Sequence, residues 1–164
     1  MGYGSTTGCG KEEVKMIAVP YTYSEWSNVL AAFKEKTNDT DILLAMQAGT
    51  VEWQSGVAER FSKKLIDAVN VRIDMAFDKF QKEIFRNDES EGEIIQAILA
   101  LRKEMKFLAQ AVNLPALPEK ERQHYFNLVL EQANIMQESL EEFAKNDRTG
   151  KLSSIIRNHK INSF

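Results

Sequence analysis

Apolar residues recur along this chain three or four positions apart, which is the spacing of one face of an α-helix. The longest such run steps by four, four, four, four, four, three and four residues, through Val57, Phe61, Leu65, Val69, Ile73, Phe77, Phe80 and Ile84. No glycine or proline interrupts this run, so the pattern predicts one long helix over about residues 51–86. Two weak points near its start, Gly49 with Thr50 and Ser55 with Gly56, predict a kink or a short break at one of them.

A second apolar stripe precedes the long helix. Its members are Trp26, Val29, Leu30 and Phe33. The stripe predicts a helix over about residues 24–36, with Ser24 as the N-cap because a serine hydroxyl accepts a hydrogen bond from the first turn. The polar residues 37–40 then predict a break and a new helix start.

Two further helices are expected after the long one. Ser90 and Glu93 form a capping box, in which each side chain bonds the backbone N–H of the other, and they predict a helix that ends near Val112. Pro118 suits the first turn of the next helix, and Gly150 suits its end. The connections are short, so successive helices should be antiparallel neighbours.

Together these segments predict an all-α fold, an antiparallel helical bundle of four to five helices with one long helix. We expect a flexible, glycine-rich N-terminal tail over residues 1–20, the helical bundle over 21–150, and a basic C-terminal tail or short helix over 151–164. If the long helix overhangs the bundle, its apolar stripe must be covered, and a second copy of the chain is the simplest cover. We therefore predict a homo-oligomer, specifically a dimer.

Composition narrows the class of protein. Of the 164 residues, 43% are hydrophobic and 27% are charged, which is typical of a folded globular domain. The net charge of -3 provides no overall positive field that would attract nucleic acid or anionic lipid. The single cysteine, Cys9, excludes an intramolecular disulfide, and no apolar run approaches the ~20 residues of a membrane span. We expect a cytoplasmic protein with no membrane span.

Catalytic and metal-binding motifs are incomplete in this sequence. Residues 5–12 resemble part of the phosphate-binding loop of P-loop NTPases, but Glu12 stands where that loop needs a serine or threonine to hold Mg²⁺. Glu121 and His124 have the spacing found in ferritin-like di-iron bundles, yet the other histidine, His159, has no glutamate three residues before it. We expect no enzymatic activity, no cofactor and no metal site.

Two groups of residues are candidates for binding a partner. The aromatic group lies in the first third of the chain and comprises Tyr21, Tyr23, Trp26 and Trp53. Aromatic side chains anchor interfaces and also fill cores, so burial decides between these roles. The basic group lies beyond the last acidic residue and comprises Arg148, Lys151, Arg157 and Lys160. These side chains either contact phosphates or complement the dipole of a helix end.

The sequence therefore favours a non-enzymatic helical protein, a scaffold or a regulator that acts through protein–protein contacts. The alternative is a small nucleic-acid-associated regulator that uses the basic C-terminal end. The two hypotheses differ in their expected ligand. The first needs an exposed apolar surface, and the second needs a gathered set of positive charges.

Overall fold

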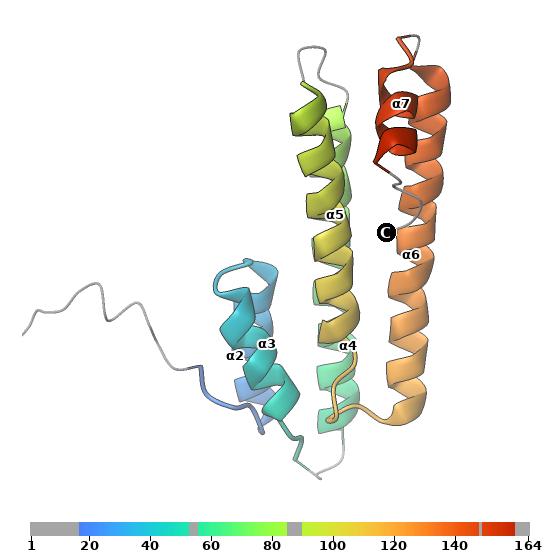
Figure 1. Ribbon diagram of the computed structural model, residues 1–164. Coiled ribbons are helices and arrows are strands. Elements are labelled where there is room, and N and C mark those ends of the chain that lie inside the picture. The colour runs from blue at the N-terminus through green and yellow to red at the C-terminus, as the bar shows by residue number, and fades with distance from the viewer. Residues whose placement is uncertain (1–16, 53–55, 85–89, 148, 160–164) are drawn as a thin grey trace, which may run out of the picture.

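The computed structural model describes residues 17–52, 56–84, 90–147 and 149–159, and these residues form six helices (Figure 1). In chain order the helices are α2 (Tyr23–Lys34), α3 (Asp39–Ala48), α4 (Val57–Ile84), α5 (Glu91–Ala111), α6 (Glu119–Asn146) and α7 (Lys151–Asn158). No strand is present in these residues, so the all-α prediction is confirmed. The helices number six because the chain breaks between α3 and α4 and because α7 follows α6.

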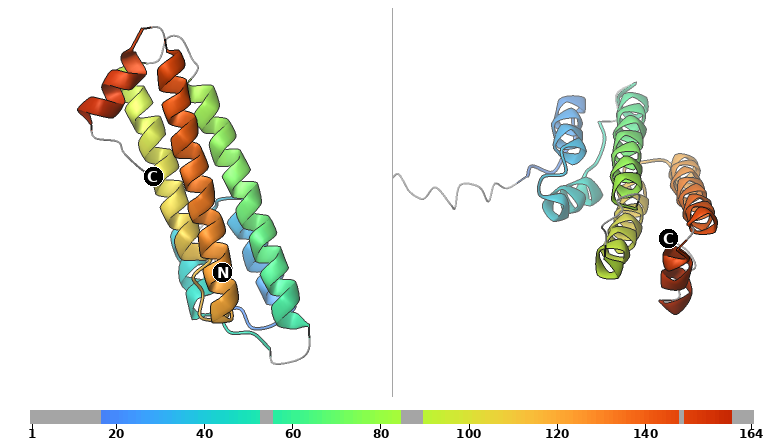
Figure 2. Two further views of the ribbon diagram at one scale, coloured as in Figure 1. Left: turned by 90° about the vertical axis from the view of Figure 1, so that its right-hand side faces the viewer. Right: turned by 90° about the horizontal axis from the view of Figure 1, so that it is seen from above.

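The long helices α4, α5 and α6 lie side by side, and successive ones run in opposite directions (Figure 1). The short helices α2 and α3 cover one half of the α4–α5 pair, with α2 packed on α4 and α3 packed on α5. At the opposite end, α7 folds back along α6 and also contacts α5 (Figure 2). Within the described residues, no helix is both long enough and apolar enough to cross a bilayer.

Capping boxes mark the starts of α2 and α5. The start of α5 is as predicted: the Ser90 hydroxyl accepts a hydrogen bond from the Glu93 N–H, and the Glu93 carboxylate accepts one from the Ser90 N–H, both at 3.2 Å. The start of α2 differs from the prediction, because its N-cap is Thr22 and not Ser24. Thr22 has Glu25 three residues after it, and that carboxylate accepts from the Thr22 N–H at 2.9 Å. This reciprocal pair satisfies two free N–H groups, whereas Ser24 alone would satisfy one.

The break before the long helix includes both weak points. Helix α3 ends at Ala48, and α4 begins at Val57 rather than near residue 51. Gly49 lies against the buried indole of Trp26, and a Cβ atom at this position would be 2.7 Å from the indole Cζ2. Gly56 has a φ of +88°, which glycine adopts without steric cost. One glycine is therefore required by close packing and the other by its backbone conformation.

Asp147 holds the junction between α6 and α7. Helix α6 ends at Asn146, so Gly150 does not terminate it as predicted; Gly150 has a φ of +70° and immediately precedes α7. One carboxylate oxygen of Asp147 accepts from the N–H and the hydroxyl of Thr149, at 3.1 and 2.7 Å. The other oxygen accepts from the Leu152 N–H at 2.9 Å. Asp147 thus satisfies a backbone donor in the first turn of α7 and orients that helix.

We expect α7 to loosen in acid. The hydrogen bond from the Leu152 N–H, together with those from Thr149, holds the pKa of Asp147 below its ordinary value of 3.8. The ionised carboxylate therefore stabilises the folded chain above that value, and this contribution is lost as the pH falls through the lower folded-state pKa. Hydrogen-exchange protection of the α7 amides should fall over this range, while Asp147→Asn should show low protection already at neutral pH. Unchanged protection in Asp147→Asn would contradict the role of this carboxylate.

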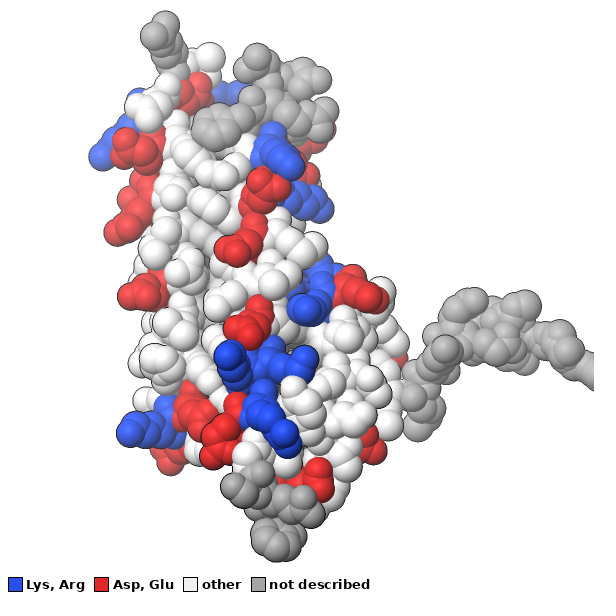
Figure 3. All heavy atoms as spheres, turned by 180° about the vertical axis from the view of Figure 1, so that it is seen from behind, with Lys and Arg blue, Asp and Glu red and all other residues white. Residues whose placement is uncertain are grey.

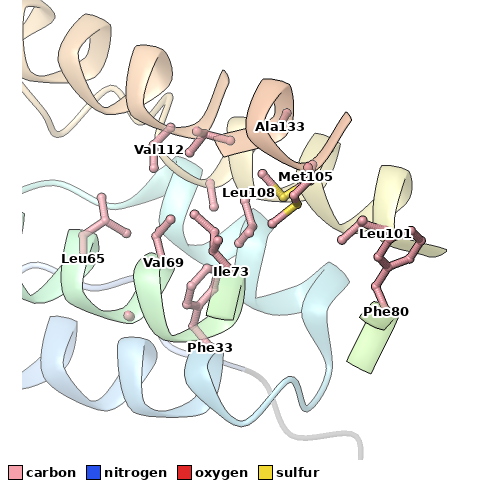
Figure 4. Close-up of a cluster of buried hydrophobic side chains, with 14 of the residues drawn as sticks. Phe33, Leu65, Val69, Ile73, Phe80, Leu101, Met105, Leu108, Val112 and Ala133 are labelled. Carbon is pink, nitrogen blue, oxygen red and sulfur yellow. The ribbon is translucent and has the colours of Figure 1, made fainter. Parts of the chain in front are cut away.

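The apolar core extends between the long helices and under α2 (Figure 4). Phe33 of α2, the Leu65, Val69 and Ile73 side chains of α4, and Leu108 of α5 are all buried in it. Six of the eight residues in the predicted α4 stripe are buried, and the other two, Phe77 and Ile84, are half-buried. The periodic pattern therefore identified the buried face of the long helix correctly.

Candidate interaction surface

The residues of the incomplete di-iron motif have separate environments. The Ser62 hydroxyl of α4 donates a hydrogen bond to the Glu121 carboxylate. Because the Ser62 proton is used in this bond, the Tyr125 hydroxyl donates to the Ser62 oxygen. His124 is exposed and stacks at an angle beside Tyr125, with ring centroids 5.7 Å apart. In the described part of the chain, no three side chains of His, Cys, Asp or Glu are placed to hold a metal ion. The Ser62, Glu121 and Tyr125 side chains join α4 to α6.

The guanidinium of Arg72 is fully buried at the centre of the protein. All five of its N–H groups donate hydrogen bonds. The two Glu104 oxygens accept at 2.9 and 3.0 Å, the two Asp39 oxygens accept at 3.0 and 2.9 Å, and the Phe33 carbonyl accepts at 3.1 Å. The rings of Phe33 and Phe107 cover the guanidinium, with centroids 4.7 and 4.8 Å from its carbon atom. No donor of this group remains for a ligand.

This Arg72 centre joins the short helices to the long ones. Burial alone would lower the pKa of Arg72, but the hydrogen bonds and negative charges of Asp39 and Glu104 outweigh burial and raise the pKa. Asp39 follows a turn in which Lys36 and Asn38 have φ values of +59° and +60°. Each such residue costs of order 1–3 kcal/mol, so the surrounding contacts must stabilise the turn. Because Phe33 lies on α2, Asp39 starts α3 and Glu104 lies on α5, one side chain of α4 connects four helices.

An apolar groove between α5 and α6 is the best candidate for binding a partner. This α5–α6 groove is lined by Met105, Lys106 and Ala109 of α5 and by Phe126, Val129, Leu130 and Ala133 of α6. Met105, Val129 and Ala133 are buried and form its floor, whereas Phe126 and Leu130 are 44% and 48% exposed. Ala109 and Ala133 leave space because their side chains end at Cβ. Two large exposed apolar side chains, one helical turn apart beside such a space, are typical of an interaction site.

The α5–α6 groove continues the seam between helices α5 and α6, on which α7 packs. Helix α7 packs on α5 and α6 with Leu152 and Ile155 buried. At its far end His159 bonds to Glu91, the first residue of α5, at 3.2 Å between Nε2 and a carboxylate oxygen. Lys106 is fifteen residues further along α5, or about 22 Å, whereas the eight residues of α7 extend only about 12 Å. Helix α7 therefore fills one end of the seam, and within the described part of the chain it does not reach the groove.

The four aromatic residues considered for partner binding are placed differently by the structure. Trp26 is fully buried against Phe61, with ring centroids 3.9 Å apart, so burial assigns it to the core. Tyr23 is half-buried beside basic side chains of α4, and Tyr21 is 44% exposed. Trp53 lies outside the described residues. Of this group, Tyr21 and Tyr23 are the members that the structure places at the surface.

The described basic residues of the C-terminal end do not form one surface. Lys151 is half-buried at the start of α7, and Arg157 is exposed near its end. Arg148 and Lys160 lie outside the described residues. The carboxylates of Asp147 and Glu91 adjoin the two ends of α7 and reduce its positive potential. On the rear face of the molecule, basic side chains gather in one region, but acidic side chains border them (Figure 3).

Comparisons of the chain with protein family models, with curated proteins and with solved structures found no match. The candidate surfaces are therefore judged on the geometry and chemistry of this chain. By that standard the α5–α6 groove is the most complete, because it combines an apolar floor, exposed apolar side chains and an adjacent helix that occupies the same seam.

Neither the Arg72 centre nor the α5–α6 groove was predicted from the sequence, although each has a signal there. Arg72 lies three residues after Val69, on the buried face of the long helix, where an arginine indicates a buried ion pair. Phe126 and Leu130 lie beside the buried stripe of α6 and give this helix a wider apolar surface than one neighbour needs.

Proposed function

We propose that the protein is a non-enzymatic interaction module that binds an amphipathic helix of a partner protein in the α5–α6 groove. The exposure of Phe126 and Leu130 beside an apolar floor is the observation that supports this proposal. Amphipathic helices bind such grooves through apolar residues spaced three, four and seven positions apart. Binding would remove both side chains from water.

The packing of α7 favours a helix as the ligand. Its two buried residues, Leu152 and Ile155, are three positions apart on one face and pack where α5 and α6 meet. A helix is thus already accommodated in the same seam. A partner helix in the groove would extend this packing along the remaining part of α5 and α6.

The position of the groove limits the cost of binding. It lies near the connection between α5 and α6, in which Val112, Leu114 and Leu117 are buried. These contacts fix the spacing of the two helices at this end. A preformed site does not have to be ordered when the ligand binds, so more of the contact energy appears as affinity.

We expect Leu130→Asn to weaken partner binding about 3- to 13-fold, because full burial of a leucine contributes about 1.5–3 kcal/mol and Leu130, which is 48% exposed, can gain about half of that. Asparagine has a similar size and adds no charge. A photoreactive benzoylphenylalanine in place of Phe126 should cross-link a specific protein from a native lysate, and Leu130→Asn should remove that product. The affinity of the purified partner for both chains then gives the magnitude.

Met75 provides the matched control, because it is 50% exposed on α4 and lies outside the groove. Met75→Asn should leave both partner binding and the melting temperature almost unchanged, as is usual for exposed positions. An equal loss of binding in Met75→Asn and Leu130→Asn would contradict the assignment of the site to the groove.

Homodimerisation and nucleic-acid binding stay predictions. Helices α4 and α6 each have 28 residues, so α4 has neighbours along its length and does not project alone. Val71 and Met75, 41% and 50% exposed, are the apolar residues of α4 that a second copy would cover. Nucleic-acid binding through the C-terminal end would weaken with salt and with Arg157→Ala.

A further inference from the structure

We infer that the helix accepted by the α5–α6 groove is acidic, with aspartate or glutamate residues beside its apolar face. This inference rests on the proposed function and specifies the chemistry of the partner. It is based on how charge is distributed along the seam between α5 and α6.

The α5 side of the groove is basic. Lys106 lines the groove, and Lys103 lies one turn before it; both are exposed. Neither lysine has an ion-pair partner among the described residues. The acid between them, Glu104, is only 10% exposed and bonds Arg72 in the protein centre. Lys106 therefore presents one positive charge to a ligand, whereas Lys103, about 200° around the helix axis from the buried Met105, points away from the groove floor.

The α6 side of the groove does not neutralise the charge of Lys106. All four of its lining residues are apolar. The nearest acid along this helix is Glu131, which is 200° around the helix axis from the buried Val129 at about 100° per residue. Glu131 therefore points away from the groove floor. A ligand helix can supply the missing negative charge.

The charge pattern is reversed where α7 occupies the seam. Helix α7 has basic residues, Lys151 and Arg157, and no acidic residue. Asp147, in the junction before α7, accepts from its first turn, and Glu91 of α5 bonds His159 at its end. The basic helix α7 thus has a carboxylate at each end. By the same complementarity, the basic end of the seam suits an acidic helix.

Two synthetic helical peptides test this inference. Both are about 16 residues long and have the same leucines at helical spacing, but the flanking positions are all Glu in one and all Lys in the other. At about 50 mM NaCl the full chain should bind the Glu peptide about three-fold more tightly by fluorescence anisotropy, and about 0.5 M NaCl should reduce the preference. Lys106→Glu should reverse it. Lys63→Glu, at an exposed position on α4, changes the net charge equally and should leave the preference intact.

The outcomes separate this inference from the proposed function. Equal affinity for both peptides, with both weakened by Leu130→Asn, would overturn the acidic partner and leave the proposed function standing. Failure of both peptides to bind would overturn the proposed function and the inference with it. Self-association that Leu130→Asn abolishes would show that a second copy occupies the groove, and would also overturn the inference.

Discussion

Replacing Arg72 with methionine should destabilise the protein by about 3–5 kcal/mol, the usual cost of removing one partner from a buried ion pair. The substitution leaves the Asp39 and Glu104 carboxylates without the cation that holds both, and Glu104 is only 10% exposed. Lys36 lies 3.5 Å from Glu104 but is 44% exposed, so it compensates little. Urea unfolding followed by circular dichroism at 222 nm measures the loss.

Two further variants show whether the charge or the geometry matters. Arg72→Lys keeps the charge, but one ammonium group cannot replace five fixed N–H donors, so we expect an intermediate loss of stability. Combining Arg72→Met with Asp39→Asn and Glu104→Gln removes all three charges and should recover part of the stability. If Arg72→Met were as stable as the parent chain, the buried guanidinium would contribute nothing to the fold.

Trp26→Ala should have an effect of similar size, about 3–5 kcal/mol, because it removes the largest fully buried side chain of the described residues. The indole packs on Phe61, and its Nε1–H donates to the Thr50 carbonyl at 2.8 Å. The cavity would open between α2, α4 and the break that follows α3. The free energy of unfolding from the same urea titration measures this loss, and Trp26→Phe, which keeps a ring but loses the N–H, should recover most of it.

Gly49→Ala tests the same contact from the opposite side. The new Cβ atom would lie 2.7 Å from the Trp26 Cζ2 and 2.9 Å from its Cη2, so the ring or the chain must shift, at about 1–3 kcal/mol. Gly92→Ala is the control: the nearest atom to its Cβ is the Ser90 Oγ at 4.0 Å, and alanine in a helix should stabilise by up to about 1 kcal/mol. A similar response at both glycines would contradict the packing argument for Gly49.

Features that depend on neighbouring residues were predicted from the sequence, whereas features that depend on residues far apart in the sequence were not. The capping box at Ser90 and the apolar stripe of α4 depend on neighbouring residues, so sequence spacing identified them. Arg72 instead bonds Glu104, Asp39 and Phe33, which are separated from it by 32, 33 and 39 positions in the sequence. No periodic pattern indicates such distant partners. The openness of the α5–α6 groove likewise depends on how far α7 extends along two other helices. Sequence spacing gives the faces of helices, while three-dimensional packing decides which face stays exposed.

The buried guanidinium has a consequence for how the molecule opens in thermal fluctuations. Helices α2 and α3 cannot swing away from α4 and α5 alone, because that motion would break several charged hydrogen bonds at once and admit water to the centre. These four helices should therefore open as one cooperative unit in native-state exchange, with similar free energies for their slowest amides. Helix α7 lies outside this unit and can detach while the rest stays folded.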